Sequence, residues 1–162
     1  MKKSDHLPVY GVGPIYVYVI AAMTLAAVLM RDLPVFASGR LERAHTLLLA
    51  LGIILIVAGV ALWIYAVPVS KIDDGIRENR LVTTGAYALV RNPIYSAVMI
   101  ACTGVLLIVG NAWFFVLPFL YWLFMTVLMK TTEEKWLREL YGEEYEDYCK
   151  RVNRCWPRLP VK

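Results

Sequence analysis

The hydrophobic and polar positions of the 162-residue chain alternate in long blocks, with three charge-free segments separated by charged ones. All 17 Lys and Arg residues and all 13 Asp and Glu residues lie outside residues 9–30, 44–70 and 94–129. Crossing a hydrocarbon core about 30 Å thick takes about 20 helical residues. The pattern therefore predicts an all-α, polytopic membrane protein with about four transmembrane helices, folded as a single domain over residues 1–162.

Helix-breaking residues divide the three blocks into individual spans. Pro68 ends the second span, Pro93 precedes the third, and Asn111 turns the last block into a helical hairpin. Gly52 and Gly59 offer room for close contact between helices. The expected spans are residues 9–30, 44–67, 94–110 and 112–129.

The first apolar block also has the position of a signal peptide, but no clear small-residue cleavage motif follows it. Residues 9–30 are long enough to span a membrane as they stand. We therefore expect a retained helix, whose start is loosened by Gly11, Gly13 and Pro14.

Amphipathic spacing resumes after the last span. Two sets of apolar residues recur at helical intervals, on either side of Gly142, a residue well placed to end a helix. This spacing predicts two short helices that form a C-terminal amphipathic cap. The two sets are Trp136, Leu137, Leu140 and Tyr141, and then Tyr145, Tyr148, Cys149 and Val152.

The distribution of basic residues predicts the orientation in the membrane. Four spans place the N-terminus, the connector 70–91 and the C-terminal tail on one side, and these carry 14 of the 17 Lys and Arg residues. Positive loops stay in the cytoplasm. We expect an integral protein of the inner or plasma membrane with these three segments cytoplasmic, although Arg31, Arg40 and Arg43 lie on the opposite side.

Composition narrows the range of partners. Hydrophobic residues make up 59% of the chain, against roughly 45–50% in soluble domains. The net charge is only +4, and residues 130–162 carry eight basic and seven acidic residues, a mixed pattern that argues against nucleic-acid binding. Cys102 lies within an apolar run, and the spacing of Cys149 and Cys155 matches no metal or redox motif. We expect no metal.

Two polar stretches at the mouths of apolar spans carry the candidate chemistry. The first runs from Leu81-Val-Thr-Thr-Gly-Ala-Tyr87 through Arg91-Asn-Pro-Ile-Tyr95, and the second runs from Thr132-Glu-Glu-Lys-Trp136 to Gly142-Glu-Glu-Tyr145. Polar, non-helical backbone beside lipid persists only where protein or a water-filled cavity covers it. The two stretches are therefore predicted to form one site at a membrane face, with Tyr95 close to Glu133.

These stretches resemble the isoprenylcysteine carboxyl methyltransferases and their phospholipid methyltransferase relatives. The resemblance also includes Tyr148 and Arg151-Val-Asn-Arg154. It implies a membrane enzyme that uses S-adenosylmethionine, releases S-adenosylhomocysteine, and builds its cofactor site from residues of about 79–158. By position, the implied cofactor-binding residues are Asn79, Arg80, Leu81, Val82, Tyr87, Asn92, Pro93, Ile94, Tyr95 and Glu133, and the candidate catalytic residues are Arg91, Glu133 and Glu134.

The residue types suit this cofactor independently. Glu133 or Glu134 could hold its ammonium group or ribose hydroxyls, and the ring faces of Tyr87 and Tyr95 suit adenine or the cationic methyl region. Arg91 or Arg154 could pair the cofactor carboxylate or an anionic headgroup. Gly85 would let backbone groups approach closely. Methyl transfer by in-line displacement requires mainly alignment and exclusion of water.

Other interpretations of the same residues stay open. The two glutamates could be a solvated first helical turn, Tyr145 and Tyr148 could be packing residues, and Arg91 could be a membrane anchor.

The acceptor is also open. Asn92 stands where the carboxyl methyltransferases have His, and Met129 stands where the eukaryotic enzymes have an Arg tied to substrate. A prenylcysteine-like carboxylate, a phospholipid amine, or a small hydrophobic thiol or amine would all be lipophilic acceptors, with membrane lipid as the surrounding partner. The alternatives to a methyltransferase are a non-enzymatic membrane scaffold or small transporter, and a sterol reductase, for which the chain is short. The sequence does not indicate an oligomeric state.

Overall fold

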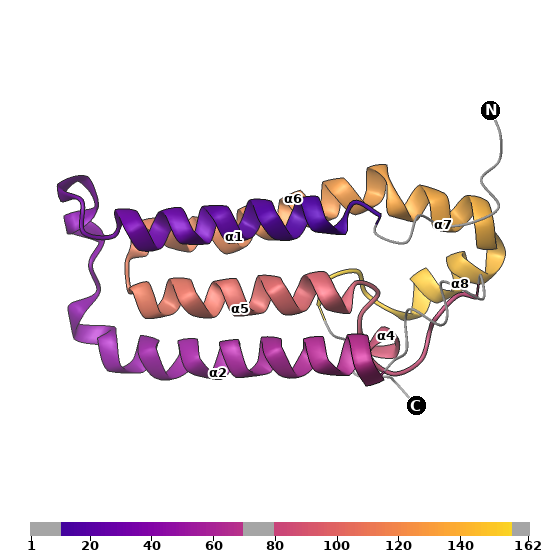
Figure 1. Cartoon of the computed structure of the whole chain (residues 1–162), viewed down its shortest axis with the longest axis horizontal. Coiled ribbons are helices and arrows are strands. Elements are labelled where there is room, and N and C mark those ends of the chain that lie inside the picture. The colour runs from indigo at the N-terminus through magenta and orange to yellow at the C-terminus, as the bar shows by residue number, and fades with distance from the viewer. Residues whose placement is uncertain (1–10, 70–79, 157–162) are drawn as a thin grey trace.

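The computed structural model describes residues 11–69 and 80–156, and its elements in this part of the chain are helices, as the sequence predicts. Four long helices lie alongside one another (Figure 1). One isolated β-bridge, between Arg40 and Asn111, joins the two loops at one end. The long helices are α1 (Gly13–Met30), α2 (His45–Ile64), α5 (Pro93–Val109) and α6 (Leu117–Thr131).

Helix α2 packs along α5 through small residues. A Cβ atom added to Gly52 would lie 2.6 Å from the Gly104 carbonyl oxygen, and one added to Gly59 would lie 2.7 Å from that of Ala97. Side chains larger than hydrogen would therefore push the two backbones apart. The close helix contacts expected at Gly52 and Gly59 are confirmed.

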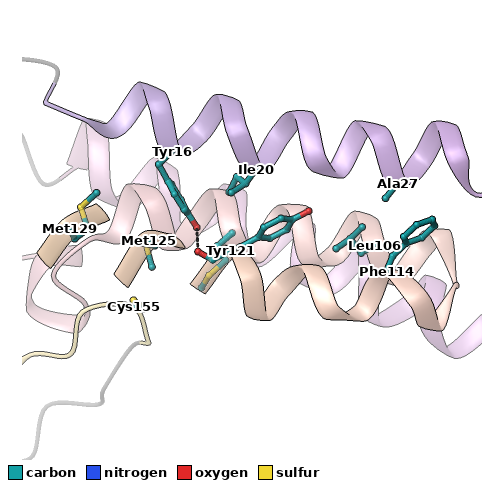
Figure 2. Packing of buried hydrophobic residues seen from close by; sticks show 10 residues of the cluster. Tyr16, Ile20, Ala27, Leu106, Phe114, Tyr121, Met125, Met129 and Cys155 are labelled. Carbon is teal, nitrogen blue, oxygen red and sulfur yellow. Dashed lines mark hydrogen bonds between the residues drawn. The ribbon is translucent and has the colours of Figure 1, made fainter. Parts of the chain in front are cut away.

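Helices α1 and α6 pack on the other side of α5 and enclose the main core (Figure 2). Tyr16 of α1 and Tyr121 of α6 are fully buried there, and the Tyr16 hydroxyl donates to the Tyr121 carbonyl oxygen at 3.3 Å. Thr24 bonds the Tyr121 hydroxyl at 2.9 Å. These polar groups can lie inside an apolar bundle because each has a hydrogen-bond partner.

The outer faces of the bundle are apolar. On α2, Leu47, Ile54 and Val57 are each about three-fifths exposed. Three helical stretches are long and apolar enough to cross a membrane, namely Gly13–Met30, Glu42–Val67 and Ala112–Tyr141, and α5 is a shorter apolar helix. This arrangement supports an integral membrane location.

Prolines lie at the ends of the α-helical segments within three of the expected spans. Helix α1 begins at Gly13, because Pro14 suits the first helical turn. The second span stops being α-helical at Ile64 and continues as the π-helical turn η3 (Tyr65–Val69), because Pro68 has no N–H to donate to Ile64.

The fourth expected span, residues 112–129, is divided. It begins as the 3₁₀ helix η4 (Ala112–Val116), and α6 starts only at Leu117 with a proline in its first turn. The turn before it is closed by Gly110, which has φ 65°, and by Asn111, which is buried and donates to the Phe36 carbonyl oxygen at 2.9 Å. The neighbouring loop contains the 3₁₀ helices η1 (Pro34–Gly39) and η2 (Glu42–Ala44).

The polar segments gather at the opposite end of the bundle (Figure 1). The two cap helices are confirmed as α7 (Glu133–Tyr141) and α8 (Glu143–Arg151), with Gly142 at φ 54° between them. The connector contains a short helix, α4 (Ala86–Leu89), that the sequence analysis did not predict. The start of α1 and the first turn of α5 lie at the same end, so segments distant in sequence meet there.

Candidate functional site

The Glu133 carboxylate joins three parts of the chain. Glu133 is the first residue of α7, and Tyr95 lies in the first turn of α5. The Tyr95 hydroxyl donates to Glu133 Oε1 at 2.9 Å, and the backbone N–H of Val12, at the start of α1, donates to the same oxygen at 3.2 Å. The structure thus brings together the two residues whose proximity was expected, and adds a third partner from α1.

Two glycines permit this approach. Gly11 has φ 45°, a conformation that favours glycine, and a Cβ atom there would lie 2.6 Å from Glu133 Oε1. A Cβ atom on Gly13 would overlap the Tyr95 hydroxyl. Any larger residue at these positions would have to displace Glu133, Tyr95 or the backbone of α1.

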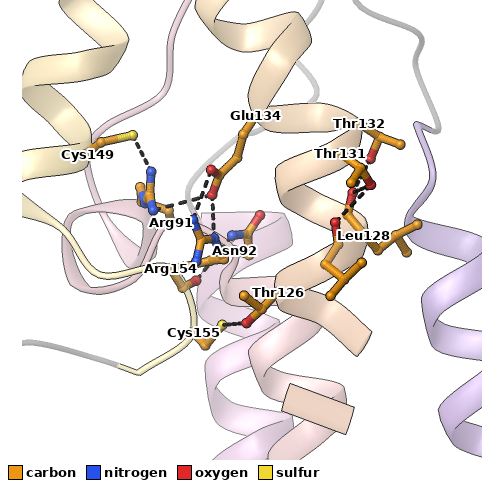
Figure 3. Close-up of polar contacts among 11 residues, drawn as sticks. Arg91, Asn92, Thr126, Leu128, Thr131, Thr132, Glu134, Cys149, Arg154 and Cys155 are labelled. Carbon is orange, nitrogen blue, oxygen red and sulfur yellow. Dashed lines mark hydrogen bonds and ion pairs between the residues drawn. The ribbon is translucent and has the colours of Figure 1, made fainter. Parts of the chain in front are cut away.

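The neighbouring carboxylate, Glu134, lies among arginines (Figure 3). Arg154 donates to both of its oxygens, with Nη2 3.0 Å from Oε2, and Arg91 Nη2 lies 3.3 Å from Oε1. The side chains of Glu134 and Arg91 are 3% and 9% exposed. The hydrogen bond with Glu134 raises the pKa of the Arg154 guanidinium. Glu134 is therefore not a solvated helix-end residue, and Arg91 and Arg154 are ion-paired within the protein.

The Arg91 guanidinium is enclosed by α8. Its central carbon lies 6.0 Å from the centre of the Tyr145 ring, and Nη1 donates to Cys149 Sγ. Its backbone N–H donates to the Asn153 carbonyl oxygen at 2.8 Å. Nε is buried with no hydrogen-bond partner in the described part of the chain. With two arginines facing one carboxylate, this cluster carries an excess positive charge.

Tyr145 and Tyr148 serve mainly as packing residues. Both are buried, and their ring centres lie 6.2 Å apart. The Tyr148 hydroxyl donates to the Tyr87 carbonyl oxygen at 2.6 Å, and burial raises the pKa of this hydroxyl. Leu81 packs against the same cluster. These contacts fix α8 against the connector and so hold Arg91 in place.

The remaining residues that the sequence predicted for the site differ in how deeply they are buried. Asn92 precedes α5 and donates to the Arg154 carbonyl oxygen at 3.2 Å, while Pro93 is buried in the first turn of α5. Val82 and Ile94 are half-buried, and Arg80 is exposed. Tyr87 is buried, and the nearby Gly85 has φ 62°, so this glycine is needed by the backbone itself. Asn79 lies outside the described residues.

The contribution of α1 was not expected from the sequence. Gly11 and Gly13 were expected to loosen the start of a helix, whereas Gly11 lies against Glu133 and Gly13 lies against Tyr95. A Gly-x-Gly-Pro sequence directly before an apolar span was the available signal, but a backbone N–H donor such as that of Val12 leaves no mark in the sequence. Within residues 11–69 and 80–156, no three His, Cys, Asp or Glu side chains are grouped so that they could hold a metal ion.

Comparison with known proteins shows the family of the chain. Residues 46–144 match the sequence profile of the family described as phospholipid methyltransferase. The chain belongs to this family. The match includes α2, α5, α6 and α7 and therefore Tyr95, Glu133 and Glu134, whereas α1 and Arg154 lie outside it.

A curated relative points to the same group of proteins. The chain is 36% identical over 88 residues to the protein-S-isoprenylcysteine O-methyltransferase of Schizosaccharomyces pombe (strain 972 / ATCC 24843). This match covers 52% of the present chain and 36% of the relative, so the chain spans little more than a third of that protein's length. No solved structure matches the chain.

Proposed function

We propose that the protein transfers a methyl group from S-adenosylmethionine to a lipophilic acceptor at the cytoplasmic face of the membrane. The observation that carries this proposal is the hydrogen bond between Tyr95 and Glu133, 2.9 Å long. It joins the two polar stretches at one end of an apolar bundle, and both residues lie within the part of the chain that matches the family. Family membership supports the same reaction.

The residues at this end fit the charges of the methyl donor. In the described chain, Glu133 is held by neutral donors, a hydroxyl and a backbone N–H, so its negative charge remains available to the donor's ammonium group or ribose hydroxyls. The Arg91–Glu134–Arg154 cluster has an excess positive charge and an unpartnered Arg91 Nε, which suits the donor's carboxylate. The donor supplies an activated methyl group on a sulfonium, and the protein's part is to align the acceptor and exclude water.

The four long helices would act as the membrane spans. With four spans, the connector and the cap would lie on the same side as most of the basic residues, which favours the cytoplasm. Acceptors dissolved in the bilayer would then reach the site from the membrane.

The acceptor classes are a prenylcysteine-like carboxylate, a phospholipid amine, and a small hydrophobic thiol or amine. Met129, which stands at the position of the substrate-linked Arg, is fully buried in the main core. A buried thioether offers no charge to a carboxylate, so this observation favours the uncharged nucleophiles.

Calorimetric titration of the purified, detergent-solubilised protein with S-adenosylhomocysteine tests the proposal. We expect saturable binding, weakened about tenfold or more by Glu133→Gln, which removes the negative charge. Glu139→Gln, an exposed glutamate on the same helix, is the matched control and should leave the affinity unchanged. No heat at millimolar ligand would favour a scaffold or transporter instead.

A labelled-methyl assay on native lipid extract then identifies the acceptor. Incubation with radiolabelled S-adenosylmethionine should label a lipid-soluble product, and acid- and base-stability of the label distinguishes an ester from an N-methyl or S-methyl group. An ester-linked product would contradict the preference for an uncharged nucleophile.

A further inference from the structure

The start of α1 has a part in the candidate site that neither the family match nor the sequence motifs assign. We propose that the Gly11–Gly13 turn forms one wall of the methyl-donor site and that the Val12 N–H positions the Glu133 carboxylate toward the donor. This inference rests on the proposed function. It makes Val12 a positioning residue that acts through its backbone.

The contact is specific because three features of the turn are required at once. The Val12 N–H reaches Glu133 Oε1 at 3.2 Å across 121 positions of sequence. Gly11 has a positive φ, and only a residue without a Cβ atom fits beside Glu133 at this position. Gly13 lies beside Tyr95, where a Cβ atom would also clash. A helix that packed on the bundle by apolar contact alone would need none of these.

Burial raises the pKa of the Glu133 carboxylate, and the hydrogen bonds from Tyr95 and Val12 oppose this shift by stabilising the ionised, oriented carboxylate. Val12 immediately precedes α1, where N–H groups without helical partners and the helix dipole attract negative charge. Both described bonds to Glu133 end on the same oxygen, Oε1. Two donors on one oxygen fix the plane of the carboxylate and leave Oε2 for a ligand.

Tyr95 is steadied from the same helix. The Tyr16 ring of α1 meets the Tyr95 ring at 5.8 Å between centres with an interplanar angle of 65°, an edge-to-face arrangement. Helix α1 therefore contacts both members of the Tyr95–Glu133 pair, although α1 lies outside the residues that match the family. The residues that match the family supply the Tyr95–Glu133 pair, and α1 holds this pair in place.

The sharpest test removes the N–H while changing little else. Val12→Pro deletes the donor, and proline is compatible with φ −96° only after a small adjustment, at a position where no helical N–H bond is lost. Val12→Ala keeps the N–H and shortens the side chain, so it is the matched control. We expect Val12→Pro to weaken S-adenosylhomocysteine binding about tenfold and Val12→Ala to leave it nearly unchanged.

A second pair tests the glycine. Gly11→Ala places a methyl group against Glu133 Oε1, whereas Gly110→Ala imposes the same kind of backbone strain, at φ 65°, with no atom nearer than 3.8 Å to its Cβ. We expect only Gly11→Ala to weaken binding. In a Glu133→Gln background, Val12→Pro should add little to the loss, because the carboxylate that it positions is already gone.

The outcomes separate this inference from the proposed function. If the wild-type protein binds no S-adenosylhomocysteine, the proposed function fails, and the contact is then tested by thermal unfolding alone. In the wild-type background, Gly11→Ala should lower the unfolding temperature more than Gly110→Ala does. In a Glu133→Ala background, the two glycine substitutions should lower the unfolding temperature by similar amounts. Equal affinities for Val12→Pro and Val12→Ala would overturn the inference, and so would tighter binding in Val12→Pro, which would make α1 a competitor of the donor.

Discussion

Glu133 and Glu134 are neighbours in sequence but belong to two different regions of the molecule. Glu133 faces α1 and α5, where its described partners are a hydroxyl and a backbone N–H. Glu134 faces the C-terminal segment, where Arg91 and Arg154 surround it. In the proposed function the first carboxylate binds the methyl donor, whereas the second forms ion pairs with Arg91 and Arg154 inside the protein.

The backbone at the start of α7 explains why the two carboxylates have different partners. Helix α6 ends at Thr131, and the next residue, Thr132, has a φ of −128° and a ψ of −90° that break the helix before α7 begins. Successive side chains on the first turn of a helix point in directions about 100° apart. The break thus directs one glutamate to each side of the chain, and substitutions at the two positions should have different consequences.

The largest expected effect is on stability, at Glu134. Glu134→Gln leaves the nearly buried Arg91 and the partly exposed Arg154 without their carboxylate partner. Losing one partner of a buried ion pair costs about 3 kcal/mol or more. We expect a large decrease in the unfolding temperature in detergent. Glu133→Gln is the comparison, and a decrease as large as that of Glu134→Gln would remove the distinction between the two carboxylates.

A smaller effect is expected from Tyr95→Phe. This substitution removes the hydroxyl that donates to Glu133 but keeps the ring against Tyr16. The free energy of unfolding should fall by about 1 kcal/mol, the usual contribution of one hydrogen bond. Binding of S-adenosylhomocysteine should weaken less than in Glu133→Gln, because the carboxylate and its Val12 partner remain. Affinity equal to that of Glu133→Gln would mean that the hydroxyl, and not the charge, contacts the ligand.

The smallest effect is expected at an exposed ion pair of the cap. Asp147 and Lys150 lie 2.8 Å apart on α8, and both side chains are about 70% exposed. Water and salt screen such pairs, so Asp147→Asn should change neither stability nor ligand affinity measurably. A measurable loss of stability would show that α8 depends on more than its buried contacts with the connector.

Much of this architecture could be predicted because charge-free blocks and amphipathic spacing are local properties of the sequence. The four long helices and the two cap helices were found in this way. The π-helical turn at Pro68 and the 3₁₀ start before Leu117 were not predicted, because they depend on which backbone groups find partners, and apolar composition does not report that.

The candidate site was predictable only in part. The motif residues indicated that Tyr95 and Glu133 would meet. Which glutamate would face the arginines depends on the backbone angles at Thr132, and the contribution of Val12 depends on a main-chain group that every residue but proline has. Neither is encoded in residue type. The short helix α4 was missed for a related reason, since four residues are too few to show a period.

The turn that begins α7 also closes the chain on itself. Through Glu133 it is fastened to the residue just before the first helix, and through Glu134 to Arg154, close to the last described residue. Both extremities of the described polypeptide are thereby tied to adjacent positions of a single turn. A substitution that breaks the contact of Val12 with Glu133 would therefore also disturb the adjacent Glu134, which holds Arg154. The converse applies to a substitution that breaks the contact of Arg154 with Glu134.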